Sequence, residues 1–168
     1  MPRKQGESMK RIEHVKTIVT PVDFSDNSKL IAESAVFMAG SFKATLIFLF
    51  VVQKFEDYSG FFVPQMNVPD FEQDLFRQAD EKMELFCKEL ELYAAEQGIV
   101  EMVGKVVVGD VAEQIVTFSN EQEHGLIAMG THGYKGLEKI MFGSIADKVV
   151  KSAACPVLTI NPYTCCLE

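Results

Sequence analysis

The sequence lacks several features that would place the protein in familiar classes. No apolar run approaches the ~18 residues of a membrane-spanning helix; the longest, Thr45–Val52, has the length of a buried strand. The N-terminal stretch 1–10 is polar and has no apolar centre of a secretory signal. We therefore expect a cytoplasmic protein without a membrane segment.

Positive charge is also scarce. The chain has 16 Lys and Arg residues against 24 Asp and Glu residues, a net charge of −8. Nucleic-acid binding needs a basic face that neutralises phosphates, so this class is disfavoured. A small phosphate ligand would also be repelled by the net negative charge of the protein. It would have to be attracted locally, by amide dipoles and a metal.

Paired cysteine motifs are absent. None of the four cysteines forms a CxxC pair or shows the spacing of zinc ligands. Cys87 and Cys155 are expected to be buried small apolar residues in a reducing cytosol. The adjacent Cys165 and Cys166 suggest a tail with free thiols, with a redox-active pair as the alternative.

Apolar periodicity and capping residues predict strands that alternate with helices. Ser25 is expected to cap the first helix and Gly40 to end it, and Asp110 with Glu113 forms a capping-box pattern. The predicted strands are Val15–Val22, Thr45–Val52, Lys105–Val108, Leu126–Met129 and Val157–Ile160. The predicted helices are Asp26–Ala39, Asp70 to the residue before Gly98, Asp110 to near His124, and Ser144–Ser152.

The alternation of strands and helices predicts an α/β fold with a mostly parallel sheet. The length of 168 residues fits one domain, and no break in composition suggests a second. We expect a disordered lead-in at 1–12, a single domain at 13–162 and a tail at 163–168. The polar and aromatic stretch Gln53–Pro69 is interpreted as a mobile loop, in which Phe61-Phe62-Val63 forms a lid or a contact patch.

A glycine-rich stretch from Met129 to Ser144 is the main candidate for chemistry. Gly130 and Gly133 follow a predicted strand, and nine residues separate Gly133 from Gly143, which precedes a predicted helix at Ser144. Glycines leave backbone amides uncovered, and a helix N-terminus adds unpaired N–H groups and partial positive charge. Folded together, the two clusters would bind a phosphate chain. The alternative is two turns and a helix cap.

Asp23 lies at the end of the first predicted strand. In open parallel sheets ligands bind at the carboxyl ends of strands where the winding reverses, and an acidic residue there can accept bonds from ribose hydroxyls. Capping of the first helix is the equally weighted alternative. Neither GxxxxGK[ST] nor an early GxGxxG is present, which argues against a P-loop NTPase and a dinucleotide dehydrogenase.

Four blocks together resemble the universal stress protein family. They are the glycine signature just described and three strand ends, listed here in chain order: Pro21-Val22-Asp23-Phe24-Ser25, Val107-Val108-Gly109 and Cys155-Pro156-Val157-Leu158-Thr159-Ile160. The similarity runs from about His14 to Asn161, and the chain keeps every glycine of the family's ATP-binding signature. The resemblance implies a member of the ATP-binding subgroup.

The resemblance implies an adenine nucleotide alpha hydrolase-like fold, an open five-stranded parallel sheet of order 3-2-1-4-5 with helices on both faces. It also implies that Asp23 holds the ribose, that the Val51 backbone bonds the adenine, and that Gly109 lets the chain pass close to the ribose. Backbone groups around the phosphates, with Mg²⁺ bridging them, complete the implied ATP site: Met129, Gly130, His132, Gly133, Gly143, Ser144 and Ile145. The implied partner is a second copy of the chain, paired through Val157, Leu158, Thr159 and Ile160.

Some positions depart from the family pattern. Tyr134 occupies a position where the family frequently has Arg or Lys. The neighbouring Lys135 would replace this positive charge if its side chain points toward the phosphates. His132 is expected to shape the turn or touch a phosphate, and no clear catalytic base is present. We therefore expect a nucleotide-responsive regulatory module with slow hydrolysis at most. The alternatives are a true ATPase or phosphotransferase, and a dimeric interaction protein whose nucleotide site is only structural.

Overall fold

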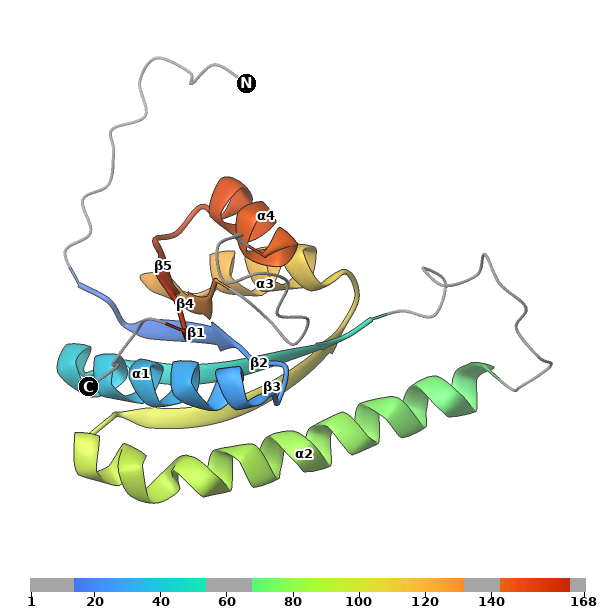
Figure 1. Cartoon of the computed structure of the whole chain (residues 1–168), viewed down its shortest axis with the longest axis horizontal. Coiled ribbons are helices and arrows are strands. Elements are labelled where there is room, and N and C mark those ends of the chain that lie inside the picture. The colour runs from blue at the N-terminus through green and yellow to red at the C-terminus, as the bar shows by residue number, and fades with distance from the viewer. Residues whose placement is uncertain (1–13, 54–67, 132–142, 164–168) are drawn as a thin grey trace, which may run out of the picture.

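The computed structural model describes residues 14–53, 68–131 and 143–163. Within these ranges strands and helices alternate along the chain (Figure 1). The strands are β1 (Thr17–Pro21), β2 (Thr45–Val52), β3 (Glu101–Val108), β4 (Gly125–Gly130) and β5 (Val157–Ile160). The helices are α1 (Asp26–Phe42), α2 (Val68–Gln97), α3 (Val111–Asn120) and α4 (Ser144–Ser152).

The five strands form one parallel sheet in the order β3-β2-β1-β4-β5, which confirms the predicted fold class and strand order. β1 is central, and the chain winds from it toward β2 and β3 before it crosses to β4 and β5. The reversal of winding therefore falls between β1 and β4, where Val19 is in register with Ile127.

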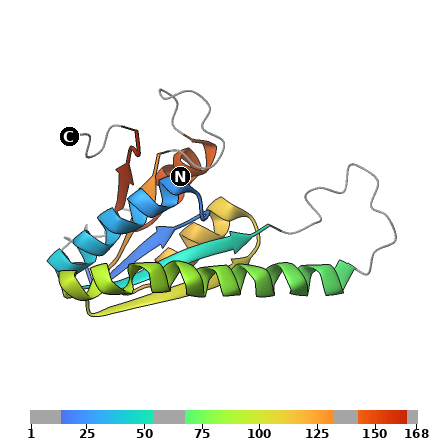
Figure 2. The ribbon, with the colours of Figure 1, turned by 60° about the horizontal axis from the view of Figure 1, so that its bottom comes forward.

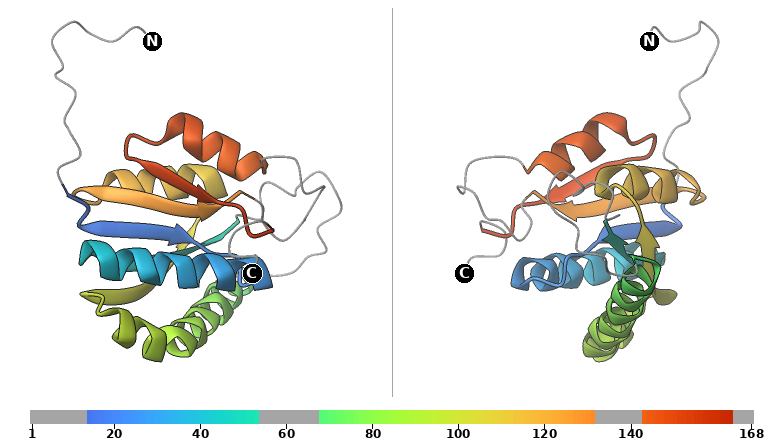
Figure 3. Two further views of the ribbon diagram at one scale, coloured as in Figure 1. Left: turned by 60° about the vertical axis from the view of Figure 1, so that its left-hand side comes forward. Right: turned by 90° about the vertical axis from the view of Figure 1, so that its right-hand side faces the viewer.

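Helices cover both faces of the sheet. α1 and α2 pack on one face, and α3 and α4 pack on the other (Figure 3). Alternate residues of each inner strand point to the two faces, so the core divides into two clusters. Ile18 and Phe48 lie in the cluster under α1 and α2, whereas Val19 and Leu49 lie in the cluster under α3 and α4. Burial on both faces explains why β2 has a continuous apolar sequence.

The predicted end of the first helix at Gly40 is wrong, because α1 continues to Phe42 and ends at Lys43 in a left-handed conformation. Gly40 instead marks a close contact between α1 and the end of α2. A Cβ atom on Gly40 would lie 2.3 Å from the carbonyl oxygen of Gln97. The glycine is needed for helix packing inside α1, not for a helix end.

Several other boundaries also differ from prediction. β1 spans Thr17–Pro21 and not Val15–Val22, and β4 spans Gly125–Gly130 and not Leu126–Met129. β3 begins at Glu101 and not at Lys105, because pairing with β2 runs along the whole strand from Thr45 opposite Glu101. α3 ends at Asn120, four residues before His124. α2 begins at Val68 and not at Asp70.

Other sequence expectations meet the structure more closely. Ser25 caps α1 and Asp110 caps α3 through side-chain oxygens that accept from backbone N–H groups. Gly98 follows α2 with a positive φ of 65°. Cys87 and Cys155 are free and only partly buried, not fully buried as expected. Burial still raises the pKa of the Cys87 thiol to about 11, which keeps it neutral.

Several expectations lie outside the described residues: the lead-in at 1–12, the loop interpretation of positions 54–67, and the tail with the free thiols of Cys165 and Cys166. Among the helices that the structure describes, none combines the length and the apolar character needed to cross a bilayer.

Candidate functional site

A pocket of about 710 Å³ lies at the carboxyl ends of β1 and β2. The last residues of β1 and β2 and the segments that follow them form its floor, including Asp23, Phe24, Val51 and Gln53. Residues of α2, α3 and α4 line its sides. This volume is in the ordinary range for small-molecule sites, and its position at strand ends next to the reversal is where open parallel sheets bind ligands.

Asp23 is held at the entrance of α1 by a compact set of hydrogen bonds. Its Oδ1 accepts from the backbone N–H of Ser25 at 3.0 Å and from the hydroxyls of Ser25 and Ser28, each at 2.5 Å. The Asp23 backbone N–H donates to Ser28 Oγ at 2.9 Å, and Ser28 is buried. One carboxylate oxygen therefore supports the start of the helix, as the structural alternative for Asp23 predicted.

Phe24 adopts a backbone conformation that is rare for a bulky residue. Its φ is 59°, in the left-handed region, which costs an L-residue roughly 1–2 kcal/mol. Packing of its ring offsets this cost. The ring stacks on Phe50 with centroids 4.6 Å apart and meets Phe86 edge-on at 5.7 Å. The strained turn therefore directs Phe24 toward the face covered by α2 and places Asp23 at the strand end.

The end of β4 and the start of α4 lie in direct contact. The Gly143 N–H donates to the Thr131 carbonyl oxygen at 2.8 Å, and the Thr131 N–H donates to Ile160 at 2.8 Å. The segment between Thr131 and Gly143 thus returns the chain to the strand that it left. Since its N–H is already bonded, Gly143 is not one of the free amide donors that the sequence suggested.

The start of α4 differs from the starts of α1 and α3. Gly143 is its N-cap residue and provides no side-chain hydrogen bond, whereas Ser25 and Asp110 cap the other two helices. Among the described residues, no side chain caps the N–H groups of exposed Ser144 and Ile145 in the first turn. Together with the positive end of the helix dipole, these groups favour an anion.

The remaining predicted residues are placed as follows. Asp23, Val51 and Ile145 line the pocket, and Val51 is almost completely buried. Met129 packs its side chain in the core cluster under α3 and α4, so only its backbone faces the strand end. Gly109 has a φ of 151°, and a Cβ there would lie 2.8 Å from Cγ of Gln114. His132 and Gly133 lie outside the described residues.

Sequence reasoning missed the contribution of α2. Apolar residues spaced by three and four positions place Leu75 and Ala79 on one helix face, which is typical of a core face, but both residues line the pocket together with Lys82. The length of the helix could have indicated this contribution to the pocket. Its 30 residues span about 45 Å, and the eight residues of β2 span only about 26 Å. Part of its apolar face must therefore extend beyond the sheet.

Metal ligands do not gather in the part of the chain that the structure describes, where no cluster of three or more His, Cys, Asp or Glu side chains suits an ion. The first turn of α4 and the exposed Ser144 hydroxyl would suit an anionic group.

Taken together, an open parallel sheet, helices on both faces and a pocket at the strand ends beside the reversal define a doubly wound α/β domain. The sequence profile described as the universal stress protein family matches residues 14–161. The chain belongs to the universal stress protein family. Universal stress protein MJ0531 of Methanocaldococcus jannaschii is 34% identical over 147 residues, which cover 87% of this chain and 82% of that protein.

Solved structures share the fold. The universal stress protein UspA from Lactobacillus plantarum superposes with a TM-score of 0.73 at 23% identity and covers 88% of this chain and 99% of its own. A universal stress protein from Archaeoglobus fulgidus, solved in complex with dAMP, superposes with a TM-score of 0.60 at 21% identity. It covers 87% of this chain and 98% of its own. Another universal stress protein, at 19% identity and a TM-score of 0.60, was solved in complex with cAMP.

Proposed function

We propose that this protein binds ATP at the strand-end pocket and acts as a nucleotide-responsive regulatory module. The observation that carries the proposal is the contact between Thr131 and Gly143, which brings the end of β4 to the uncapped start of α4. A phosphate chain held there would continue toward Asp23 and Val51 in the adjoining pocket. The related structures with dAMP and cAMP add support, because both ligands are adenine nucleotides.

Each residue has a distinct part in the proposed site. The Val51 backbone, at the end of β2, would bond the adenine edge, and Asp23 would accept from a ribose hydroxyl. Oδ1 of Asp23 already accepts three bonds at the start of α1, so the ribose would use Oδ2. The N–H groups of Ser144 and Ile145 would hold phosphate oxygens, and the Ser144 hydroxyl would add a bond.

Mg²⁺ fits the proposed site as an ion held mainly by the phosphates of ATP. The described residues offer no ready-made carboxylate cluster, and Mg²⁺ often binds proteins through nucleotide phosphates and water. The ion would also neutralise phosphate charge within a chain whose net charge is −8. Titrations with ATP should therefore give tighter binding in Mg²⁺ than in a chelator.

The decisive variant is Gly130→Val combined with Gly143→Val. Branched side chains would fill the space next to the end of β4 and the start of α4. We expect calorimetric titration with Mg-ATP to show at least a hundredfold loss of affinity, with the far-UV circular dichroism unchanged. Ala154→Val is the matched control, because it adds the same kind of bulk at an exposed position at the opposite end of β5. Normal ATP binding by the double variant would mean that the glycines form only a turn and a cap.

Turnover separates a binding module from an enzyme. We propose slow hydrolysis at most, because the described pocket contains Asp23 but no second acid or base besides Lys82. Release of phosphate by the purified protein faster than about 1 s⁻¹, the low end of ordinary enzyme rates, would favour the ATPase instead.

The proposed assembly is a homodimer joined through β5, and the proposed compartment is the cytoplasm. β5 is an edge strand of uncharged residues, Val157–Ile160, and Leu158 is 41% exposed. An uncovered apolar edge tends to pair, and a second copy of the same strand would cover it with two-fold symmetry. The free thiols of Cys87 and Cys155 are in keeping with a reducing compartment.

A further inference from the structure

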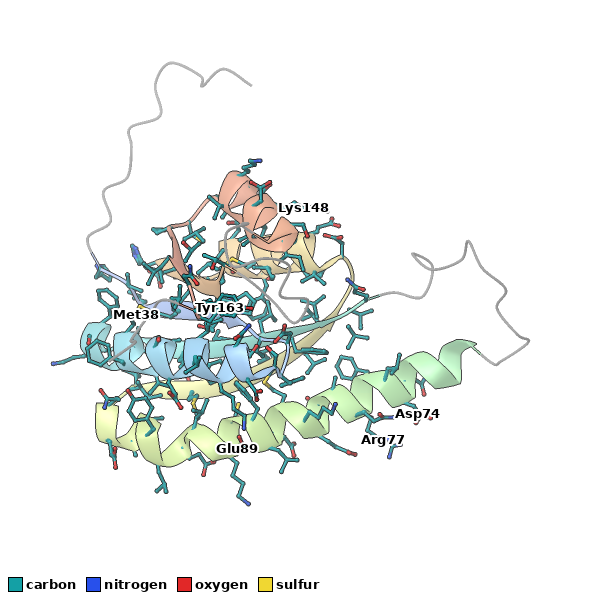
Figure 4. The ribbon with its side chains drawn as sticks, in the orientation of Figure 1. Met38, Asp74, Arg77, Glu89, Lys148 and Tyr163 are labelled. Carbon is teal, nitrogen blue, oxygen red and sulfur yellow. The ribbon has the colours of Figure 1, made fainter. Side chains whose placement is uncertain are left out.

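The N-terminal end of α2 extends past the carboxyl end of β2. Both Figure 1 and Figure 2 show this part of the helix beyond the edge of the sheet, and Figure 4 labels Asp74 and Arg77 on it. Leu75 and Ala79 lie on the same helix and line the pocket at the strand ends. The pocket is therefore not confined to the α3 and α4 face, where the proposed nucleotide contacts lie.

The α2 side of the pocket has its own set of lining residues. We name it the α2 compartment and define it by Phe24, Phe50, Leu75, Ala79 and Lys82. Phe24 and Phe50 pack with the core under α1 and α2, whereas Val51 and Ile115 on the other side belong to the core under α3 and α4. The stacked rings of Phe24 and Phe50 and the side chains of α2 make the walls of the compartment apolar.

Lys82 gives the α2 compartment a single positive charge. Among the described lining residues Asp23 and Lys82 alone are charged, so Lys82 is the one cation there. Two neighbouring cations of this region are already paired, Arg77 with Asp74 at 3.1 Å and Lys29 with Glu89 at 2.8 Å. Within the described ranges Lys82 forms no ion pair, which leaves its ammonium group available for a ligand.

We propose that the α2 compartment binds the chain of a medium-length monocarboxylate, with the carboxylate paired to Lys82. An apolar chain suits walls made of Phe24, Phe50, Leu75 and Ala79. A single lysine matches a single negative charge. The compartment adjoins the proposed nucleotide cleft, but its lining residues lie on the opposite face of the sheet. Carboxylate binding therefore does not depend on ATP binding.

Calorimetric titration of the full chain with hexanoate, octanoate and decanoate tests the apolar part of the proposal. Each buried methylene should strengthen binding about fourfold, as transfer from water predicts. Octylammonium, which has the same chain and the opposite charge, should bind at least tenfold more weakly than octanoate. Absence of octanoate binding at millimolar concentration, or equal binding of the two ions, would overturn the proposal.

Charge reversal at Lys82 tests the polar part. Lys82→Glu should weaken octanoate at least tenfold and strengthen octylammonium relative to the wild type. Lys88→Glu is the matched control, because Lys88 is an exposed residue of the same helix outside the pocket lining and the change in net charge is identical. Equal weakening by both variants would mean a general effect of charge, and the assignment to Lys82 would be wrong.

The location is tested with the ATP-site variant. Octanoate should bind the Gly130→Val, Gly143→Val protein within threefold of wild type even when Mg-ATP no longer binds. Loss of octanoate from this variant while the circular dichroism is unchanged would place octanoate in the nucleotide cleft and refute the α2 compartment. If wild type binds octanoate but no ATP, the carboxylate proposal stands and the proposed ATP function falls.

Discussion

Asp23 has to serve two purposes if the proposed ATP site is correct. Its Oδ1 joins Ser25 and Ser28 at the start of α1, and its second oxygen would meet the ribose. Substitutions that keep one oxygen and remove the charge can separate the two purposes.

Asp23→Asn should leave the fold largely intact and weaken Mg-ATP about tenfold. The amide oxygen can still accept from Ser25 and Ser28, but the amide nitrogen cannot accept from a ribose hydroxyl. Urea unfolding should show a loss below about 1 kcal/mol, in the range of one hydrogen bond. Calorimetric titration gives the affinity.

Ser28→Ala is the matched comparison for Asp23. Ser28 is buried, donates to Asp23 Oδ1 and accepts from the Asp23 N–H. Its removal should cost about 1–3 kcal/mol of stability, because these groups lose their partner. ATP affinity should change less than in Asp23→Asn. An Asp23→Asn protein with wild-type affinity would assign Asp23 to the helix start alone.

At the scale of single residues, local chemistry made several positions predictable. Ser25 and Asp110 are caps because a short side-chain oxygen reaches the next free N–H groups, an interaction within four residues. The left-handed conformation of Phe24 was not predictable, because its cost is offset by contacts with Phe50 and Phe86 that are distant in sequence. The same holds for the Gly143 N–H, whose partner Thr131 is fixed only by folding.

At the scale of elements, the contact between α1 and α2 makes a prediction for Gly40. Gly40→Ala should destabilise the protein by about 1–3 kcal/mol, although alanine is the better helix former. The new Cβ would meet the carbonyl of Gln97 at 2.3 Å, and backbone atoms cannot turn aside as a side chain can. The free energy of unfolding in urea is the measurement.

Ser34→Ala provides the control for the Gly40 experiment. Ser34 is partly buried in the middle of the same helix, and its hydroxyl donates to the Leu30 carbonyl at 3.0 Å in an exposed hydrogen bond. Loss of this exposed side-chain hydrogen bond in Ser34→Ala should leave the stability of the protein unchanged or raise it by a few tenths of a kcal/mol. A Gly40→Ala protein as stable as Ser34→Ala would show that α2 can shift freely to admit a methyl group.

Apolar periodicity alone does not determine where each helix and strand begins and ends. Val157–Ile160 and Ser144–Ser152 were predicted at their observed bounds, because Pro156 and Gly143 mark clear starts. The first half of β3 was missed, because an edge strand with Glu101 and Gly104 shows little apolar alternation. Its pairing with β2, not its own composition, makes those residues a strand.

At the scale of the whole molecule, the two edges of the sheet differ. β5 presents no charged side chain, whereas β3 carries exposed Glu101 and Lys105. Charges on an edge strand oppose pairing with another sheet. The proposed homodimer therefore uses the one edge that lacks this protection.

Leu158→Glu should convert the proposed dimer to a monomer. A carboxylate on each copy would lie at the two-fold interface without a partner and would be costly to bury. Sedimentation velocity at micromolar concentration is the measurement, and Mg-ATP titration should be unaffected because the pocket lies at the ends of β1 and β2.

Val150→Glu is the control for the dimer experiment. Val150 on α4 is 46% exposed, close to the 41% of Leu158, and it receives the same substitution away from the edge strand. It should sediment as the wild type does. A wild-type protein that is already monomeric at this concentration would contradict the proposed assembly.

The overall architecture was the most predictable feature, because strand and helix alternation together with the family resemblance fix the strand order. The full extent of the pocket was not. The α2 compartment is formed because α2 is longer than the strands that it covers. This difference is found only when the lengths of elements distant in the sequence are compared.

The charged edge strand β3 would also limit the number of subunits in the proposed assembly. Two copies joined through β5 would form one continuous sheet with a β3 strand at each end, and both ends would repel further strands. Assembly would then terminate at two subunits and could not continue into a filament. Glu101 and Lys105, remote from every proposed ligand, would in this way protect a concentrated solution of the protein from polymerising.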